Sequence, residues 1–469
     1  MSRVLFIDLI EDFYDRHAIY SLSAFMKKHD VEVYFVRDKS YKRLLQKIAG
    51  IKPNFLLYST VSSYMPMYIE FDRMAKENFT VKSLIGGPGP TFDWKCIEGS
   101  TIDAACVGEG EFALVDFIKG GFAGGKNIFC RGADAPSDFH NLVDLDSLPF
   151  PDRDLVYQYD SLIGDTPSKQ FLSGRGCPYE CTYCFNHKFM DIFKKYGPSV
   201  RKKSVDYLIE EILLVKSRYP LANVVFSDDT FILNRKWFLE FCESFPRDIG
   251  LAYTCNIRAN LMDEEIVKAL SRSGCIGVNW SIESGDDFLR NTVLKRRMSV
   301  EQILDTSNLL TKYRIPYRIG NVIALPGESF EQMLGTLELN IKARPSLALA
   351  NIFVPFPGLE LTRYAIERGY YKPDPKAGLP ANLATRSVME ISLAENRNIQ
   401  KLMCLFPICV SFPFLFYNSL MRKFLFCLPV CLLKMIYQTI FTFKMMKIYM
   451  IKASFFHRCR MAARYIMNI

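Results

Sequence analysis

The stretch GRGCPYECTYCF, residues 174–185, decides how the rest of the chain is interpreted. It places Cys177, Cys181 and Cys184 in a C-x3-C-x2-C pattern. Thiolates are soft ligands that favour zinc or iron–sulfur clusters. A structural zinc site uses four protein ligands, whereas three thiols suit a site with one position left open for chemistry. His187 is the only imidazole close by, so a Cys3His zinc site stays open as an alternative.

Strand-like and helical segments alternate around and beyond the three cysteines. The predicted strands are 169–174, 223–229, 251–257, 276–282, 317–325 and 349–356. The predicted helices between them are 204–217, 235–244, 262–273, 300–313 and 329–343. Six consecutive βα units predict a partial or complete parallel barrel, in which the chemistry gathers at the carboxyl ends of the strands. The cysteines follow the first of these strands, where an active-site loop belongs.

The first 130 residues show the same alternation. The predicted strands are 3–9, 31–36, 55–60, 81–87 and 104–110, and the predicted helices are 18–29, 41–49, 65–77 and 111–119. Buried-type strands with intervening helices predict a Rossmann-like, doubly wound parallel sheet. Ligands of such sheets bind at the carboxyl ends of the strands, where Ser59, Thr60, Gly86 and Gly87 lie. No G-x-G-x-x-G follows the first strand, so the dinucleotide fingerprint is missing.

The composition divides the chain further. Residues 121–165 are rich in Gly, Asp and Pro, which indicates a connector between domains. We therefore predict an α/β chain with an N-terminal domain at 1–130, a linker at 131–165, a barrel at 166–375 and an α-helical region at 376–469. The N-terminus has acidic residues within its apolar run and does not resemble a signal peptide. This favours the cytoplasm, where thiols stay reduced.

The charge of the chain is uneven. The whole chain carries +9, but residues 396–469 hold 11 basic residues and no acidic one, so the first 395 residues carry −2. The apolar runs at 402–417 and 424–433 are shorter than the ~20 residues of a membrane-spanning helix. Two interpretations remain: helices lying on a membrane surface through 396–469, or a basic helical subdomain that covers the barrel.

Seven ordered segments resemble one family. C-x3-C-x2-C after the first strand of a βα barrel is the hallmark of radical S-adenosylmethionine (SAM) enzymes, and GRGCPYECTYC is similar to the version of the subgroup with an N-terminal cobalamin-binding domain. The other matching segments are GGPGPTF (86–92), VGEGEFALVDF (107–117), LDSLPFPDRDL (145–155), VNWSIESGDD (278–287), NVIALPGES (321–329) and PFPGLEL (355–361). The resemblance covers about residues 1–370.

The resemblance implies a role for particular residues of the barrel. Cys177, Cys181 and Cys184 would hold three irons of a 4Fe–4S cluster, and SAM would chelate the fourth. Reduction of the cluster would then cleave SAM to methionine and a 5′-deoxyadenosyl radical. The residues implied to contact SAM are Tyr183 near the adenine, Ser227, Asp228 and Asp229 near the amino group, Arg258 near the carboxylate, and Glu283 and Ser284 near the ribose. For Asp229, helix capping is the competing structural role.

The resemblance also implies a cobalamin in the N-terminal domain. Ser59, Thr60, Gly86 and Gly87 would line the groove for its nucleotide tail. Cobalamin proteins that bind cobalt through a histidine use D-x-H-x-x-G. Asp15 and His17 match its first part, but Tyr20 stands where the Gly should be. His17 is therefore expected at the start of a helix and not on cobalt.

The expected activity is the methylation of an unactivated carbon in a small-molecule or lipid substrate. A radical cyclisation or rearrangement of a tetrapyrrole or hopanoid-like lipid is the alternative, and a non-enzymatic cobalamin or metal sensor is an alternative of another class. The resemblance implies an electron donor such as flavodoxin or ferredoxin. Methylthiolation of RNA is disfavoured, because the N-terminal domain lacks the extra cluster cysteines and no small β-rich RNA-binding domain is predicted at the end of the sequence. No nucleic-acid partner is therefore expected.

Overall fold

The computed structural model describes residues 2–12, 14–121, 124–133, 138–374, 379 and 386–449. The part of the predicted basic helical region that lies beyond position 449 is outside the described residues. By their contacts, the described residues form two compact units. Unit 1 comprises the described residues up to Pro167 and Lys188–Leu221, and unit 2 comprises Ser168–His187 and the described residues from Ala222 to Tyr449. The four-part division expected from the sequence stays a prediction.

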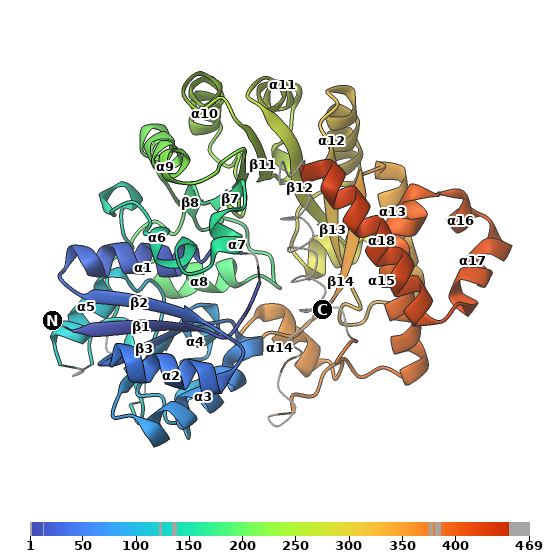
Figure 1. The fold of residues 1–469 in the computed structure, drawn as a ribbon. Coiled ribbons are helices and arrows are strands. Elements are labelled where there is room, and N and C mark those ends of the chain that lie inside the picture. The colour runs from blue at the N-terminus through green and yellow to red at the C-terminus, as the bar shows by residue number, and fades with distance from the viewer. Residues whose placement is uncertain are drawn as a thin grey trace. The chain divides into compact units, whose positions relative to one another are not determined.

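Unit 1 contains a six-stranded sheet in the order β2-β1-β3-β4-β5-β6 (Figure 1). The strands are β1 (Arg3–Asp8), β2 (Glu32–Arg37), β3 (Phe55–Ser59), β4 (Lys82–Gly86), β5 (Ala104–Cys106) and β6 (Ile128–Cys130). The first five are parallel, as predicted, and β6 is an antiparallel edge strand inside the stretch expected to be a connector. Val4 and Phe6 pack into the core on one face, while Leu5 and Ile7 pack into the core on the other. Both faces are covered, as a doubly wound sheet requires.

The helices of unit 1 that the sequence predicts begin within one residue of their predicted positions, whereas the short helices at 88–92, 154–157 and 161–164 were not predicted. The helices of this unit are α1 (His17–Lys28), α2 (Tyr41–Ile51), α3 (Met65–Asn78), α4 (Pro88–Phe92), α5 (Glu111–Lys119), α6 (Asp154–Tyr157), α7 (Ser161–Gly164) and α9 (Val205–Arg218). The helix α8 (Phe185–Phe193) begins directly after the third cysteine. Ser40 and Ser204 each accept a backbone N–H with the side chain and so fix the starts of α2 and α9.

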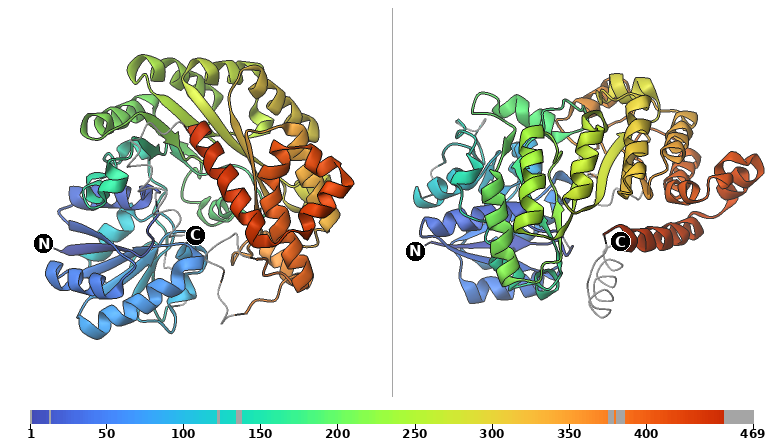
Figure 2. Two further views of the ribbon diagram at one scale, coloured as in Figure 1. Left: turned by 45° about the vertical axis from the view of Figure 1, so that its right-hand side comes forward. Right: turned by 90° about the horizontal axis from the view of Figure 1, so that it is seen from above.

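Unit 2 contains a second six-stranded parallel sheet in the order β14-β13-β12-β11-β10-β7 (Figures 1 and 2). Its strands are β7 (Ser168–Phe171), β10 (Asn223–Phe226), β11 (Ala252–Asn256), β12 (Cys275–Glu283), β13 (Tyr317–Ile323) and β14 (Leu347–Ile352). All six were predicted. Their order in the sheet is the same as their order along the chain, as in a partial barrel. The short strands β8 (Gly174–Arg175) and β9 (Arg201–Lys202) lie outside this sheet.

The helices that follow these strands carry clear start signals. They are α10 (Arg235–Asp248), α11 (Glu264–Arg272), α12 (Val300–Lys312), α13 (Phe330–Ala343) and α14 (Glu360–Glu367). Asn234 and Asp263 cap α10 and α11 with their side chains. Ser299 and Ser329 form reciprocal capping boxes at α12 and α13, in which a serine and the glutamine three residues later satisfy each other's backbone N–H groups.

The C-terminal helices are α15 (Leu393–Ser411), α16 (Phe414–Tyr417), α17 (Ser419–Cys427) and α18 (Val430–Tyr449). The buried side of α15, including Leu402, Phe406 and Ile408, packs into one hydrophobic core with Ile323 and Ile352 of the sheet. Among the described residues no single helix is long and apolar enough to cross a membrane. The pair formed by α17 and residues 430–445 reaches that length and composition together, with a bend of 109°.

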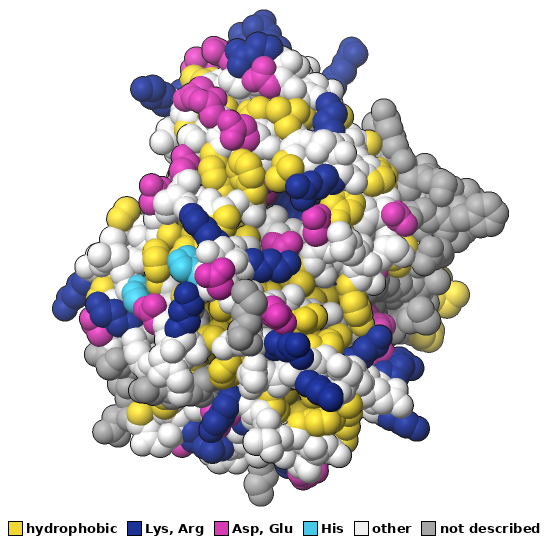
Figure 3. Space-filling model, turned by 60° about the vertical axis from the view of Figure 1, so that its left-hand side comes forward, with side chains coloured by type: hydrophobic (Ala, Val, Ile, Leu, Met, Phe, Trp, Pro, Cys, Tyr) yellow, Lys and Arg dark blue, Asp and Glu magenta, His cyan; other side chains and the backbone are white. Residues whose placement is uncertain are grey.

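The surface of the molecule is mixed in charge on the face drawn in Figure 3. Lys and Arg side chains alternate there with Asp and Glu side chains. This distribution agrees with the near-neutral charge of the first 395 residues.

Candidate functional site

The loop that carries the three cysteines is fixed at its base by Asp228. This loop leaves the sheet after β7, and Asp228 follows the neighbouring strand β10. The buried carboxylate of Asp228 accepts hydrogen bonds from the backbone N–H of Ser173 (3.0 Å) and from its hydroxyl (2.5 Å). Asp228 thus holds the cysteine loop to the sheet, and its carboxylate oxygens are already engaged there.

The three thiols lie in an environment that penalises charge. Cys181 is buried, whereas Cys177 and Cys184 are partly exposed. Burial raises the pKa of Cys184 to about 12, and the nearby Asp229, Cys181 and Cys177 act in the same direction. Burial also raises the pKa of Cys177, with contributions from Asp229 and Cys181. Iron therefore has to displace the protons of Cys177 and Cys184 when it binds.

Two buried guanidinium groups flank Cys181. Nη1 of Arg258 lies 3.9 Å from the sulfur, and Nη1 of Arg296 lies 3.8 Å from it. Arg258 also stacks on the ring of Tyr179 at 3.7 Å and donates to the backbone carbonyl of Arg296. The Nε atoms of both arginines are buried without a hydrogen-bond partner among the described residues. Two cations with unused donors suit an anionic group, as an iron–sulfur cluster with thiolate ligands is.

Arg296 was not singled out from the sequence. It lies in the segment LKRRMS (294–299), which resembles an exposed charged run. The structure buries Arg296 and leaves its neighbour Arg297 on the surface, where it pairs with Glu180. Burial opposes the charge of Arg296, but Tyr183, Glu283 and Cys181 raise its pKa, so the guanidinium stays protonated. Only the fold distinguishes the two arginines.

The partly buried Tyr183 and the buried Glu283 form a pair beside these cations. The hydroxyl of Tyr183 donates to Oε1 of Glu283 (2.8 Å) and accepts from Nη1 of Arg296 (3.1 Å). Glu283 ends β12 with a φ of +72°, a left-handed conformation that non-glycine residues rarely adopt. Such strain is stored where the surroundings fix a side chain in place. The residue expected at the adenine and one expected at the ribose are therefore directly joined.

The remaining residues expected to contact SAM differ in the groups that their side chains contact. Asp229 is the carboxylate that influences the thiols of Cys177 and Cys184, and burial raises its own pKa. It does not cap the following helix, because Asn234 does. The hydroxyl of Ser227 lies 3.4 Å from the side-chain oxygen of Gln170, and that of Ser284 accepts the backbone N–H of Asp286 (3.3 Å). Asp229 is thus the acidic candidate whose charge acts on two of the three cysteines.

The geometry does not favour a Cys3His zinc site. Nδ1 of His187 lies 3.9 Å from Oε2 of Glu360, so this imidazole faces a carboxylate. In the part of the chain that the structure describes, no three His, Cys, Asp or Glu side chains surround one point as ligands of a single ion would. A cluster does not require such convergence, because each thiolate binds a different iron. Three thiols that can each bind an iron, with two guanidinium groups beside Cys181, therefore fit a 4Fe–4S cluster.

In unit 1, the predicted cobalamin residues lie at neighbouring strand ends. Thr60 donates its N–H to the carbonyl of Gly86 (2.9 Å), so the loops after β3 and β4 are joined. Gly87 has a φ of +97°, and a Cβ there would lie 2.7 Å from the carbonyl oxygen of Thr60. The backbones of the two loops can approach only because residue 87 lacks a side chain. The hydroxyl of Ser59 lies next to the same position. These small residues suit an edge on which a large ligand rests.

We expect Gly87→Ala to lower the free energy of unfolding of unit 1 by about 2–4 kcal/mol, because it combines a left-handed conformation with a backbone clash. Gly50 in α2 is the matched control, since a Cβ there meets nothing within 4 Å and its φ is not left-handed. Gly50→Ala should stabilise the helix by about 0.5–1 kcal/mol. Urea unfolding measures both, and equal stability of Gly87→Ala and the wild type would contradict the close loop contact.

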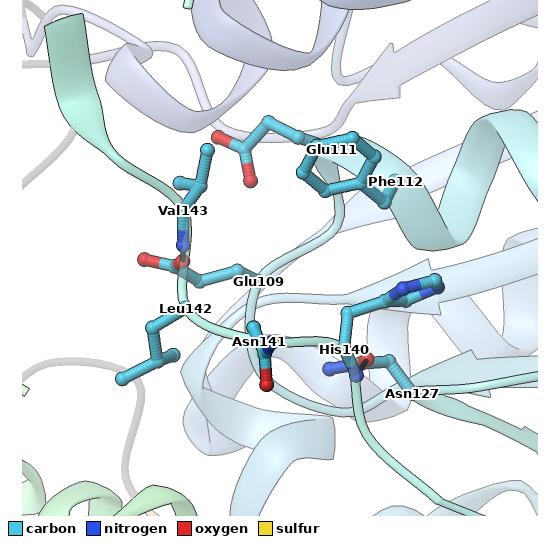
Figure 4. A pocket seen from close by; sticks show the side chains of 8 residues that line it. All are labelled: Glu109, Glu111, Phe112, Asn127, His140, Asn141, Leu142 and Val143. Atoms are coloured by element: carbon cyan, nitrogen blue, oxygen red, sulfur yellow. Dashed lines mark hydrogen bonds between the residues drawn. The ribbon is translucent and has the colours of Figure 1, made fainter. Parts of the chain in front are cut away.

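The GEGE segment lines a small pocket in unit 1, and its carboxylates are engaged in internal contacts (Figure 4). Glu109 pairs with Arg201 at 2.6 Å and accepts the N–H of Val143. Glu111 accepts the hydroxyl of Ser21 at 2.8 Å. The residues that line the pocket are Glu109, Glu111, Phe112, Asn127, His140, Asn141, Leu142 and Val143. This motif therefore ties α1, α5 and the following chain together.

His17 lies at the start of α1, as expected, and beside a buried network. Its ring packs edge-on against Tyr20. Burial and the nearby Arg153 lower its pKa to about 4. The carboxylate of Asp15, two residues earlier, accepts from Tyr20 (2.9 Å) and Tyr157 (2.7 Å). The D-x-H segment is thus part of the packing of unit 1.

The comparisons with known proteins agree with this geometry. A family model described as the radical SAM superfamily matches residues 171–339. An uncharacterized methyltransferase of Pyrococcus horikoshii is 25% identical over 74% of this chain and 77% of that protein. The anaerobic magnesium-protoporphyrin IX monomethyl ester cyclase of Rubrivivax gelatinosus is 24% identical over 69% of this chain and 60% of that protein.

One solved structure shares the fold over most of its length. It is the radical SAM methyltransferase TsrM of Kitasatospora setae, solved with cobalamin and a [4Fe–4S] cluster bound. Its TM-score is 0.65 at 15% identity, and the match covers 80% of each chain. The family model covers the cysteine loop and most of the strands of the sheet in unit 2, so this chain contains a radical SAM domain that includes residues 171–339.

Proposed function

We propose that this chain is a cobalamin-dependent radical SAM enzyme that methylates an unactivated carbon of a small-molecule or lipid substrate. The observation that carries the proposal is the cysteine loop after β7, with Cys181 between the buried cations Arg258 and Arg296. The similarity to the Pyrococcus and Kitasatospora proteins supports methyl transfer over other radical reactions.

The residues of unit 2 would divide the work of holding the cofactors. Cys177, Cys181 and Cys184 would bind three irons, and the cluster would supply the electron that cleaves SAM to a 5′-deoxyadenosyl radical. Asp229 would face the ammonium group of SAM, because its carboxylate acts on the thiols of Cys177 and Cys184. Arg258 would pair with the carboxylate of SAM, and the guanidinium groups of Arg258 and Arg296 would stabilise negative charge on the cluster.

The remaining SAM contacts follow from Tyr183 and Glu283. Because they hydrogen-bond to each other, they would place the adenine and ribose of SAM as one unit. Ser284 would lie at the ribose beside Glu283, and Ser227 would add a hydroxyl near the amino group. Asp228 would act on SAM indirectly, through its hold on the cysteine loop.

In unit 1, two joined loops would bind the nucleotide tail of cobalamin through Ser59, Thr60, Gly86 and Gly87. The cobalamin would supply the methyl group. The support is their position at the carboxyl ends of β3 and β4, where ligands of such sheets bind. The electron would come from a donor such as flavodoxin or ferredoxin. The enzyme would act in the cytoplasm. If its substrate is a lipid, it would act at the inner face of the membrane.

A cobalamin-dependent cyclisation or rearrangement of a tetrapyrrole or hopanoid-like lipid is the second candidate. The similarity to the Rubrivivax cyclase favours it, although that similarity spans less than two thirds of the cyclase. Both candidates share the same cofactors and the same radical. They differ in whether a methyl group ends in the product.

Methyl-labelled SAM separates the candidates. We expect the anaerobically purified enzyme to release 5′-deoxyadenosine and to place the label in its product. Label-free product together with 5′-deoxyadenosine would favour the cyclase. A brown protein without cobalamin absorption would keep the radical chemistry and remove the methyl carrier. A colourless protein that carries one zinc and no iron would end the radical interpretation, and a protein that binds cobalamin but neither holds iron nor cleaves SAM would favour the sensor.

A further inference from the structure

The exposed apolar side chains of the described residues gather on the C-terminal helices. Ten large hydrophobic side chains are at least half exposed, and seven of these lie between positions 412 and 443. They are Phe412, Phe414, Tyr417, Leu420, Phe424, Met435 and Phe443. Isolated exposed hydrophobic residues are normal on a protein surface, but a gathering of aromatic and aliphatic side chains marks an interaction site.

These helices are anchored on one side and exposed on the other. Phe416, Leu425 and Leu433 are buried in the same core as α15 and the edge of the sheet. Figures 1 and 2 show α16 and α17 on the outer side of α15 and α18, away from the strands. The exposed apolar side chains therefore stand on packed helices.

The charge of this region is of one sign. No acidic residue follows Glu395, whereas Arg422 and Lys423 lie within α17 and Lys434 within α18. The guanidinium of Arg422 lies 5.4 Å from the ring centre of Phe416. Aromatic side chains next to cations are typical of helices that lie in a membrane interface, with apolar groups among the acyl chains and basic groups at lipid phosphates.

We propose that the exposed side of α16, α17 and the start of α18 is a docking surface for a membrane that contains anionic lipids. We call it the α16–α18 face, and its defining residues are Phe412, Phe414, Tyr417, Leu420, Arg422, Lys423, Phe424 and Met435. The face gives the proposed peripheral location a physical basis, but docking does not depend on the proposed chemistry. A second copy of the chain fits less well, because symmetric pairing would bring two basic surfaces together.

The test is co-sedimentation of the full chain with vesicles. We expect binding to phosphatidylcholine vesicles that contain phosphatidylglycerol, and weaker binding as salt is raised. The double variant Leu420→Glu/Phe424→Glu should weaken binding about 100-fold or more, since two apolar side chains no longer leave water. Arg422→Gln/Lys423→Gln should weaken binding to these vesicles about 30-fold and leave binding to pure phosphatidylcholine unchanged.

The matched control is Leu393→Glu/Phe288→Glu, which changes two exposed apolar residues outside the face and should bind as the wild type does. Melting temperatures check that each variant is folded. The proposal is overturned if the full chain ignores anionic vesicles at low salt, or if Leu420→Glu/Phe424→Glu binds as the wild type does. It is also overturned if light scattering finds a dimer that this variant dissociates while vesicles stay unbound. Since neither SAM nor cobalamin enters the readout, a failed methylation assay would not affect it.

Discussion

Cys177→Ala is expected to lose the iron–sulfur cluster and all reductive cleavage of SAM. Each of the three thiols would hold a different iron, so the loss of one opens a second corner of the cluster to solvent. Cys181→Ala and Cys184→Ala should behave in the same way, because each removes one of the three thiols of the C-x3-C-x2-C pattern. Iron and sulfide content of the anaerobically reconstituted protein measures the cluster, and 5′-deoxyadenosine release measures cleavage.

His187→Ala is the control for the cysteine variants. In a Cys3His zinc site it would remove a ligand, whereas in a cluster site it should leave both iron content and SAM cleavage unchanged. The structure favours the second outcome, because His187 lies beside Glu360. If the purified chain instead holds one zinc that His187→Ala releases, the cluster assignment is wrong.

Most of the fold was predictable because its strands are buried and its helices carry caps. For example, β13 was predicted at 317–325 and spans Tyr317–Ile323. The edge strand β6 was missed, since it has only three residues between glycine-rich turns and pairs antiparallel. Short segments of this kind are defined by the neighbouring strand and not by their own pattern.

The C-terminal region shows a different limit of sequence patterns. The apolar run at 402–417 was compatible with both a membrane surface and a packed helix. Its first part belongs to α15 and is buried against the sheet, whereas Phe412, Phe414 and Tyr417 are exposed. Composition is the same for both parts, so only the contacts reveal which part is core.

The site was predictable where a motif defines it and not where the fold does. The cysteines follow from their spacing, and Glu283 and Arg258 were named because strand-end segments resemble the radical SAM family. Arg296 lies outside any strand, 13 positions after Glu283, in a run of basic residues. The structure places it against Cys181 and Tyr183. This unpredicted contact leads to a second strong effect.

Arg296→Met should make the cluster harder to reduce. Reduction adds negative charge beside Cys181, and the buried guanidinium stabilises that charge. A hydrogen bond from a charged group contributes about 1.5–3 kcal/mol, which corresponds to a midpoint potential about 60–130 mV more negative for one electron. If cleavage follows reduction, SAM cleavage should fall about 10- to 100-fold while the iron content stays unchanged. Potentiometric titration followed by electron paramagnetic resonance measures the shift.

Two further variants separate charge from structure. Arg297→Met removes a neighbouring but exposed arginine, whose side chain is 70% accessible, and should leave the potential unchanged. Arg296→Lys keeps the positive charge but cannot reproduce the hydrogen bonds to both Tyr183 and the carbonyl of Ser281. If the guanidinium acts through its charge, lysine restores most of the potential. If Arg296 serves only to hold Tyr183 and Glu283 in place, Arg296→Lys and Arg296→Met should shift the midpoint potential of the cluster equally. That result would contradict the electrostatic role of Arg296.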